Sequence, residues 1–520
     1  MPIFGNLVKR ALRIRKKIVL PRGSAKRYQQ QVLRRLLTKA MFTEFGEHYH
    51  FSEILVQPDW IEQYRNTVPY YAYNDMFDQW WHKCQEGQPN VCWPGKVKYF
   101  ALSSGTSESA SKHIPVTRDM LRHIRKVGIK QLYSMVNFPI PSRSFEKGIL
   151  MLSGTTNLFN RGSYYEGDMS GISAKNIPRW FRYFYKPESN ISYSSNWEER
   201  IKMIVQSAPN WDVSTVCGVP AWVQILFEEI IQTYQVDHIH DIWPNLTAYI
   251  HGGVSIEPYR DSFEQLLGRP ISFIETYMAS EGSFGFQSRP EARGMKLVLN
   301  EGIFFEFIPF NEDNFDPDGN VRPNAKAYMI HEVVEKVNYA IVLSTSAGAW
   351  RYVLGDVVSF TDTIQNEIVV VGRTKHFLSL CGEHLSVENM NKAIQTVSRK
   401  LDLKINEYTV TGFKYEKRFA HKWYIGTDNS KADPEAIRSL IDETLCAIND
   451  DYAVERRSAL KEIFVEVLPN KIFIDYMRLQ GKEGAMHKFP RVLKNGLLDQ
   501  WIHFLQQQEL PIQGHPPGAS

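Results

Sequence analysis

Apolar residues near the start of the chain follow a helical pattern rather than a strand pattern. Within residues 26–46 they recur every three or four positions, at Leu33, Leu36, Leu37 and Ala40. This spacing predicts an amphipathic helix whose apolar stripe docks on the body of the protein. A polar, aromatic-rich stretch follows to about residue 95. We therefore expect a lead-in segment ahead of the first sheet.

Strand and helix patterns alternate from residue 97 to about residue 290. The run VKYFALSSGTS at 97–107 has strand character, and apolar positions recur at helical spacing from Asp119 onward. Further short apolar strands alternate with helix-like segments such as 221–234; these strands cover 148–154, 213–220, 246–254 and 271–280. The alternation predicts a parallel α/β sheet with ligand-binding groups on loops at the strand ends.

After residue 295 the strand patterns follow one another closely. They cover 302–310, 327–334, 339–345, 356–362 and 367–373, and the turn signal DPDGN separates the first two. This pattern predicts antiparallel strands in a barrel-like arrangement. From about residue 377 onward, helices are predicted at 386–400 and from Pro434 to about Tyr452, and strands at 406–427 and 462–467.

We therefore predict an α/β protein with two domains. Residues 1–375 form a large N-terminal domain that contains the parallel α/β sheet and the antiparallel, barrel-like part. Residues 376–520 form a smaller, mobile C-terminal α+β domain, joined through the segment GRTK at 372–375. A chain of 520 residues is too long for one small hydrophobic core, which agrees with this division.

Composition favours an ordinary globular protein, with 43% hydrophobic and 13% aromatic residues. The five cysteines form no CxxC or other close pair, so the sequence suggests neither a disulfide framework nor a zinc ribbon. No apolar run reaches the roughly 18 to 20 residues that a membrane span requires. We expect a cytoplasmic, monomeric protein without stable membrane insertion.

Charge is distributed unevenly along the chain. Twelve Lys and Arg residues precede the first acidic residue, Glu44, so the chain after residue 43 has a net charge of −8 against +4 for the whole. A basic segment can meet anionic lipid or nucleic acid. It can also be the solvated face of a helix that docks through its apolar stripe. We favour the second interpretation and expect no nucleic-acid partner.

The first candidate for chemistry is the run Ser103-Ser104-Gly105-Thr106-Ser107, with Lys112 shortly after it. A strand that ends in a small, hydroxyl-rich loop can wrap a triphosphate, because hydroxyls and backbone N–H groups donate to phosphate oxygens. The run is not a Walker P-loop, which needs GxxxxGK[ST]. By itself it is also compatible with a simple Ser/Gly turn.

Three further segments occur in order with plausible separations. Residues 251–254 (HGGV) form a tight loop after an apolar strand, where a flat base could lie against the backbone. Residues 277–281 (YMASE) end the next strand and offer a ring, a hydroxyl and a carboxylate. Residues 351–356 (RYVLGD) end in a carboxylate. Together these groups could hold adenine, phosphate with Mg²⁺, and ribose.

With these motifs the sequence resembles the acyl acid amido synthetases of the Gretchen Hagen (auxin-responsive) family, a branch of the adenylate-forming superfamily. Six motifs carry the resemblance, in order along nearly the whole chain: RNTVPYYAYNDM (65–76), FALSSGTS (100–107), YMASEG (277–282), STSAGAWRYVLGDVVSF (344–360), VVGRTKHFLSLCGEHLS (370–386) and HKFPR (487–491). The resemblance implies a ligase that uses ATP and Mg²⁺ to adenylate a carboxylic acid and then transfers the acyl group to an amine, for which an amino acid is expected.

The resemblance also implies an ATP site. Four hydroxyl residues would bind the phosphates: Ser103, Ser104, Thr106 and Ser107. Tyr277 would stack on adenine, with Gly252 and Gly253 beside it. Asp356 would accept hydrogen bonds from the ribose hydroxyls, and Arg373 would lie beside the ribose at the hinge.

Catalytic roles carried over from the family fall on Ser104, Glu281 and Lys488. Ser280 would lie near the α-phosphate and the substrate carboxylate, and Glu281 would face Mg²⁺. Lys488 would reach the carboxylate and the α-phosphate from the small domain, where a preorganised cation stabilises the developing negative charge. Lys482, in the turn-like run QGKEG, is the rival lysine.

Three departures from the family pattern keep other functions open. Glu108 and Ser109 stand where the family usually carries glycine, Val353 replaces a typical arginine, and Met278 replaces a glycine. One alternative is a coenzyme A or carrier-thiol ligase with the same first half-reaction. The other is a non-catalytic nucleotide-binding homologue, against which the presence of Lys488 argues.

Metal and substrate signals outside these motifs are weak. The run His331-Glu332-Val333-Val334-Glu335 resembles HExxH but lacks the second histidine, and we predict a strand there rather than a helix. The acid itself cannot be identified. Aromatic residues at 150–185 would suit a flat or apolar acid, and they are equally compatible with ordinary packing.

Overall fold

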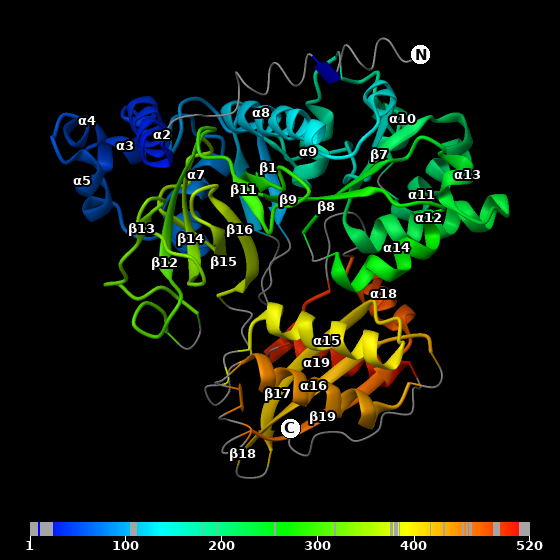
Figure 1. Cartoon of the computed structure of the whole chain (residues 1–520). Coiled ribbons are helices and arrows are strands. Elements are labelled where there is room, and N and C mark those ends of the chain that lie inside the picture. The colour runs from blue at the N-terminus through cyan, green and yellow to red at the C-terminus, as the bar shows by residue number, and fades with distance from the viewer. Residues whose placement is uncertain are drawn as a thin grey trace.

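The computed structural model describes most of the chain, in segments. These are residues 9–10, 24–103, 112–179, 181–194, 196–253, 256–316, 319–374, 378, 383, 385–415, 418–429, 432–449, 452–453, 456, 460–481, 489–493 and 495–508. Within them a large unit built on a central sheet stands above a smaller unit (Figure 1).

The central sheet has twelve strands in one continuous order. From one edge to the other they are β13 (Tyr328–Met329), β12 (Ile303–Pro309), β14 (Asn338–Thr345), β15 (Tyr352–Asp362), β16 (Glu367–Arg373), β11 (Met295–Leu297), β10 (Gly282–Phe286), β9 (Ser272–Ala279), β8 (Ala248–Gly252), β7 (Val213–Gly218), β3 (Gly148–Met151) and β6 (Tyr185–Lys186). Strands β9, β8, β7, β3 and β6 are parallel to one another, and the others pair antiparallel. The parallel α/β sheet predicted from the alternating pattern is therefore confirmed.

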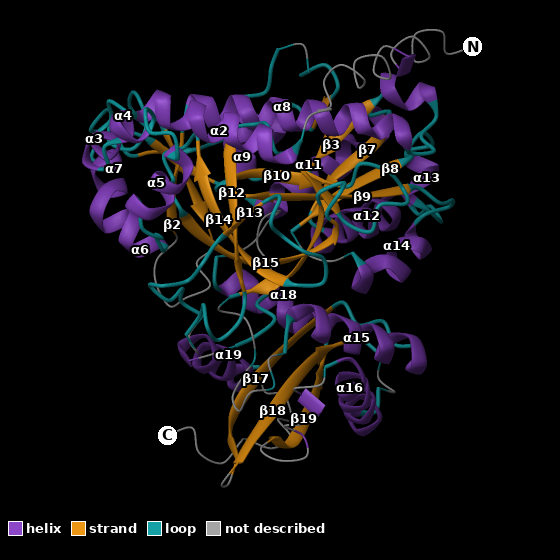
Figure 2. Ribbon diagram, turned by 60° about the vertical axis from the view of Figure 1, so that its left-hand side comes forward, coloured by secondary structure: helices purple, strands orange, loops and turns teal. Residues whose placement is uncertain are grey.

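Helices cover the parallel half of the sheet on both faces (Figure 2). One face packs against α11 (Trp197–Ser207), α12 (Pro220–Tyr234) and α14 (Arg260–Leu266). The end of α8 (Arg118–Ser134) and the turn after it pack against Ala248 and Ile274 on the other face. A sheet buried on both faces explains why its strands read as nearly continuous apolar runs.

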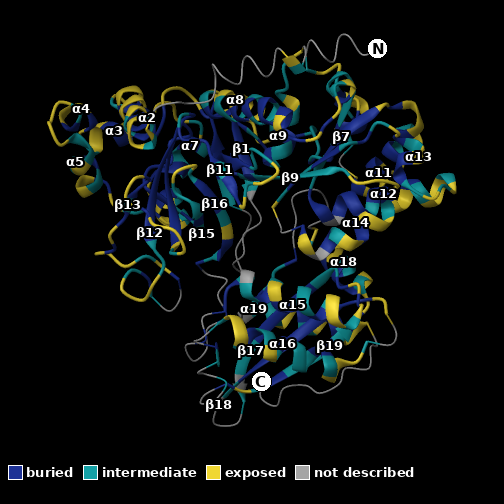
Figure 3. Ribbon diagram, viewed as in Figure 1, coloured by how far each residue is buried: buried dark blue, intermediate teal, exposed yellow. Residues whose placement is uncertain are grey.

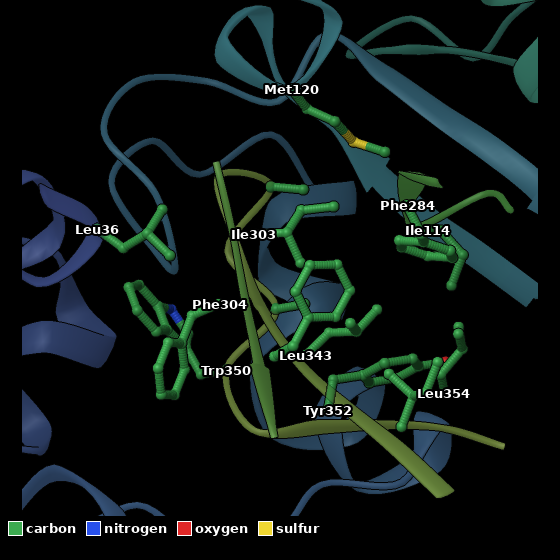
Figure 4. Close-up of a cluster of buried hydrophobic side chains, with 14 of the residues drawn as sticks. Leu36, Ile114, Met120, Phe284, Ile303, Phe304, Leu343, Trp350, Tyr352 and Leu354 are labelled. Carbon is green, nitrogen blue, oxygen red and sulfur yellow. The ribbon is translucent and has the colours of Figure 1, made fainter. Parts of the chain in front are cut away.

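The antiparallel half continues the same sheet. Its strands, predicted to be barrel-like, run in open order from β13 to β10 rather than forming a separate unit. The lead-in helix α2 (Ala25–Ala40) packs its apolar stripe on this half, in the largest buried cluster of the described residues. Figure 4 shows part of that cluster around Phe304, Leu343 and Trp350. Docking of the predicted stripe is confirmed, although the helix ends earlier than residue 46.

Short elements fill the rest of the large unit. A second sheet has the order β2 (Lys112–Val116), β1 (Tyr99–Ser103), β5 (Tyr165–Gly167), β4 (Phe159–Asn160). The remaining α-helices described are α3 (Glu44–His48), α4 (Phe51–Ile54), α5 (Trp60–Thr67), α6 (Tyr73–Met76), α7 (His82–Gln85), α9 (Met169–Lys175), α10 (Ser189–Tyr193) and α13 (Ile239–Ile242).

The smaller unit is an α+β layer structure, as predicted. Its sheet has the order β17 (Glu407–Tyr415), β18 (Arg418–Gly426), β19 (Leu460–Leu468), and its helices are α15 (Val387–Leu401), α16 (Pro434–Ile448), α18 (Asn470–Leu479) and α19 (Asn495–Gln507). Buried residues concentrate on the strands of both units and on the inner helix faces (Figure 3). A large α/β domain followed by a smaller α+β domain confirms the predicted fold class.

One predicted strand is largely wrong. The apolar run at 327–334 forms a strand only at Tyr328–Met329, and His331 and Glu332 lie in a turn. The turn is closed by the Glu332 carboxylate, which accepts a hydrogen bond from the Met329 N–H at 2.7 Å.

In the described ranges, every helix is too short or too polar to cross a bilayer.

Candidate active site

Two neighbouring parallel strands end beside each other in the middle of the sheet. Strand β8 ends at Gly252, which lies opposite Thr276 of β9. Strand β9 ends at Ala279 and turns through Ser280 and Glu281 into β10. Ligands of open α/β sheets bind at the carboxyl ends of the parallel strands. Residues 251–253 and 277–281 of the two motifs therefore meet at one edge of the sheet.

Glycine is required where β8 ends. A Cβ atom added at Gly252 would lie 2.5 Å from the Thr276 carbonyl oxygen, which is closer than real Cβ atoms approach backbone. Gly253 has φ of +88°, in the region that L side chains rarely adopt. The backbone here follows its neighbour closely, so the two glycines predicted to lie near adenine have a structural reason to be glycine.

Tyr277, Asp356 and Arg373 form one connected group. The Tyr277 hydroxyl donates to Asp356 Oδ2 at 2.7 Å, and Arg373 Nε lies 2.9 Å from Asp356 Oδ1. Residues 356 and 373 are cross-strand partners in β15 and β16. The Asp356 carboxylate raises the pKa of Arg373, and burial together with Asp356 raises the pKa of Tyr277. Asp356 is therefore held in place by a cation and a neutral phenol.

Glu281 provides a second carboxylate in the same neighbourhood. It is only 7% exposed, and the Tyr352 hydroxyl donates to its Oε1 at 3.3 Å. Burial raises the pKa of Glu281, while the positive charge of Lys112 opposes that shift. Ser280 beside it is 6% exposed. A buried carboxylate of this kind favours a cation as its partner.

The predicted phosphate loop and the predicted catalytic lysine lie outside the described residues. Strand β1 ends at Ser103, which pairs with Lys112 at the start of β2. Ser104, Thr106 and Ser107 lie outside the described residues, and so does Lys488. Of the predicted nucleotide-binding residues, the structure thus brings together Tyr277, Asp356 and Arg373.

Motif reasoning missed one residue of this group. Tyr352 is fully inside the protein at 1% exposure and contacts Glu281, although the sequence gave no reason to single it out within RYVLGD. Arg351 begins the same motif but points elsewhere, into an ion pair with Glu306 of β12. Arg351 precedes β15 and has φ of +40°, a conformation that the local sequence does not specify.

Domain profiles of one family match most of the chain. They describe the GH3 family N-terminal domain over residues 15–161, the GH3 family central domain over 296–373 and the GH3 family C-terminal domain over 388–496. Together they cover more than half of the chain. They also follow the order of the described elements, from the lead-in helices through the antiparallel strands to the small unit.

Curated relatives are plant amido synthetases. Jasmonoyl-L-amino acid synthetase GH3.5 of Oryza sativa subsp. japonica is 23% identical over 516 residues, which span 83% of this chain and 86% of that relative. Indole-3-acetic acid-amido synthetase GH3.4 of Arabidopsis thaliana is 27% identical over 181 residues, which span 33% of this chain and only 30% of that relative.

Solved structures share the fold. The AtGH3.15 acyl acid amido synthetase in complex with 2,4-DB superimposes with a TM-score of 0.75 at 16% identity, over 95% of this chain and 96% of that chain. A 2-hydroxyisobutyryl-CoA ligase in the postadenylation state, with 2-HIB-AMP, gives a TM-score of 0.57 at 13% identity, over 93% of this chain and 91% of that chain. The family resemblance drawn from the six motifs is confirmed: the chain belongs to the GH3 family.

Proposed function

We propose that the protein is an ATP-dependent ligase that adenylates a carboxylic acid and transfers the acyl group to an amine, an amino acid being the expected acceptor. The observation that supports this most is the Tyr277–Asp356–Arg373 group, with Glu281 beside it at the carboxyl end of β9. Membership of a family whose curated relatives are amido synthetases supports the carbon–nitrogen bond.

Asp356 is suited to bind ribose. An ionised carboxylate has about four lone-pair positions, and Tyr277 and Arg373 occupy one on each oxygen. The remaining positions can accept from two hydroxyls of a sugar. Because the carboxylate is already held, little conformational entropy is lost when ribose binds.

Glu281 is the residue that fits Mg²⁺. Within the described ranges no group of three or more His, Cys, Asp or Glu side chains could hold a metal ion. Mg²⁺ commonly binds through one or two carboxylates together with substrate phosphates and water, so one buried carboxylate is sufficient. When bound, the ion would neutralise charge on the phosphates. Its positive charge would also keep Glu281 ionised despite burial.

The reaction has two steps. A carboxylate oxygen of the acid attacks the α-phosphorus of ATP, forms the acyl–AMP bond and expels pyrophosphate. The amine nitrogen then attacks the acyl carbon, loses a proton to solvent or to a nearby base, and expels AMP. Lys488 stabilises the first transition state from the domain that begins at residue 376, and closure of that domain excludes water. The hydroxyls of Ser103, Ser104, Thr106 and Ser107 bind the phosphates.

A screen of pyrophosphate release tests the proposal. A panel of carboxylic acids is offered with ATP and Mg²⁺, first without acceptor, then with amino acids, then with coenzyme A. We expect one class of acids to release pyrophosphate and an amide to form only with amines. A thioester product in place of an amide would assign the protein to the coenzyme A ligases, and nucleotide binding without pyrophosphate release from any acid would contradict ligase activity.

A further inference from the structure

A buried arginine beside the parallel half of the sheet forms no ion pair with any of the described residues. Arg200 of α11 is 5% exposed, and its Nε has no hydrogen-bond partner in the described part of the chain. None of the ion pairs found among the described residues includes it. The guanidinium stacks on the Trp197 ring, 4.8 Å from its centroid. Burial lowers the pKa of Arg200, and the negative charge of Asp168 offsets this only in part.

Such a group is costly in the folded protein. A buried charge is normally paired or hydrogen-bonded, because removing it from water costs several kcal/mol. Arginine does not escape the cost by losing its proton, since the guanidinium stays protonated in proteins. The cost is recovered if an anion occupies the position during the working cycle. Arginine suits a carboxylate in particular, because its planar fork can donate two parallel hydrogen bonds.

Neutral polar groups surround the arginine. The Tyr185 and Ser153 hydroxyls lie 3.3 Å apart, and the positive charge of Arg200 acts on Tyr185. Cys217 belongs to the same neighbourhood, and burial raises the pKa of its thiol to about 12, so that it is uncharged at neutral pH. Two hydroxyls and a thiol can donate to an anion, but none of them neutralises Arg200.

The position of these groups connects them with the active site. Tyr185 begins β6, Ser153 follows β3, and Cys217 lies near the end of β7, opposite Met151. Because β3, β6, β7, β8 and β9 are parallel, the carboxyl ends of β3 and β7 lie on the same edge of the sheet as Gly252 and Glu281. A substrate bound at that edge could therefore extend from Glu281 toward Arg200.

We infer that Arg200 binds a carboxylate of a substrate, with the Ser153 and Tyr185 hydroxyls as additional donors. This inference rests on the proposed ligase function and specifies its substrates. The carboxylate that is activated cannot be the one on Arg200, so a second carboxylate is required. It is either the second carboxylate of a dicarboxylic acyl substrate or the α-carboxylate of the acceptor amino acid.

Kinetics with matched ligands distinguish the two sources. In the first arm, pyrophosphate release is measured with acid pairs of equal length, such as adipate and hexanoate. In the second, amide formation is measured with amino acids and their carboxamides. In one of the two arms, we expect Arg200→Met to raise KM roughly 10- to 100-fold for the ligand that carries the extra carboxylate, because hydrogen bonds to a charged group are lost. The KM of the matched ligand without that carboxylate should stay within about twofold of the wild-type value. Arg200→Lys should recover part of the affinity.

A measurement of stability distinguishes an arginine that binds a ligand from one that is merely structural. Because Arg200 forms no ion pair with the described residues, Arg200→Met should unfold at the same urea concentration as the wild type or a higher one. A large loss of stability, or an equal KM change for ligands with and without the carboxylate, would overturn the inference. No change in either arm would overturn it as well.

Failure of the ligase proposal is distinguishable from failure of the inference. If the wild type releases no pyrophosphate with any acid, the proposed function is wrong. Calorimetry with adipate, hexanoate, amino acids and their carboxamides then decides the role of Arg200. Binding of carboxylate-bearing ligands that is lost in Arg200→Met supports the site, and binding that is absent or unaffected by the substitution rules it out.

Discussion

Arg351 and Arg200 are equally buried, at 5% exposure each, yet their surroundings are opposite. Arg351 makes two contacts of 3.0 Å with the Glu306 carboxylate, through Nε and Nη2. Its Nη1 donates to the Val68 carbonyl at 2.8 Å, and the guanidinium lies 4.1 Å from the Tyr70 ring centroid. Arg200 forms no ion pair with the residues that the structure describes; its guanidinium contacts the Trp197 ring, and the charge of Asp168 acts on it.

The difference separates a structural charge from one that is available to a ligand. Arg351 has its donors satisfied by groups of the folded chain, so it joins the lead-in segment to β12 and has little left to offer a substrate. Arg200 carries the same cost of burial without that compensation. The sequence analysis assigned a role to neither arginine, although Arg351 lies in a family motif and Arg200 lies in no motif. Burial alone therefore does not identify a functional arginine. The hydrogen-bond and ion-pair partners of its guanidinium distinguish a functional arginine from a structural one.

The largest expected effect lies on the structural side of the comparison. Arg351→Met should lower the free energy of unfolding by about 3–5 kcal/mol, because it leaves the buried Glu306 with one fewer counter-charge and the Val68 carbonyl without its donor. Urea unfolding measures this, with Arg200→Met as the matched control of equal burial. Similar losses in the two variants would remove the distinction between the arginines.

The next effect concerns the catalytic cation predicted in the small domain. Lys488→Ala should form acyl-adenylate slower by about 10²- to 10³-fold, as when one preorganised donor is removed from a transition state, and should still bind ATP. Transfer from a supplied acyl-adenylate should change much less. Rapid-quench assays of the two half-reactions test this, with Lys482→Ala as the control. If Lys482→Ala slowed acyl-adenylate formation and Lys488→Ala did not, Lys482 and not Lys488 would be the catalytic lysine.

The third prediction concerns Asp356, a carboxylate that already has partners in the protein and is still proposed to bind ribose. Asp356→Asn keeps the size of the side chain but loses the charge, so ATP binding should weaken by about 1.5–3 kcal/mol. Calorimetry with Mg²⁺ and ATP gives the difference. Asp362→Asn on the same strand, where the Asp362 carboxylate accepts from the Gln365 N–H at 2.8 Å, should leave the affinity unchanged. Equal affinities for wild type and Asp356→Asn would place the ribose elsewhere.

His251 extends the comparison to a buried side chain whose charge depends on pH. Burial, with a smaller effect of Arg260, lowers its pKa to about 4, and its Nδ1 has no partner among the described residues. Since the unfolded histidine takes up a proton near pH 6.5 and the folded one only near pH 4, its contribution to stability is intact above pH 6.5 and is lost as pH falls toward 4. Between pH 7 and pH 5 the wild type should lose about 2 kcal/mol more than His251→Gln.

Urea unfolding at several pH values checks this expectation. Burial raises the pKa of Glu275 to about 6, which acts in the opposite direction, but Glu275 is present in both proteins and its contribution cancels in the difference. Parallel pH profiles for wild type and His251→Gln would mean that the histidine is not held in its neutral form.

Periodicity predicted the elements of the fold well where one face of each element is buried. The stripe of α2, the parallel strands and the α+β order of the small unit all follow patterns of a few residues. Two features depend on distant partners and could not be read in this way. Strand pairing decides that the antiparallel strands extend the same sheet, and the carboxylate of Glu332 turns the chain after Met329.

For the site, motifs identified residues but not their partners. Asp356 and Arg373 were both expected near ribose, and their mutual ion pair follows from the register of β15 and β16, which no local pattern specifies. Arg200 was not expected because a polar residue on an amphipathic helix is normally solvated. It is nevertheless buried, with its guanidinium against the Trp197 ring. Whether the remaining motif residues bind ATP is still a prediction.

The central claim is that the acid is activated by attack on the α-phosphorus of ATP. Isotope transfer tests it most directly: an accepted acid labelled with ¹⁸O in both carboxylate oxygens is turned over with ATP and an amine, and the products are analysed by mass spectrometry. The account predicts one ¹⁸O in AMP, one ¹⁸O in the amide and no label in pyrophosphate. Label in inorganic phosphate, with ADP as the nucleotide product, would show activation through an acyl phosphate and would contradict the account.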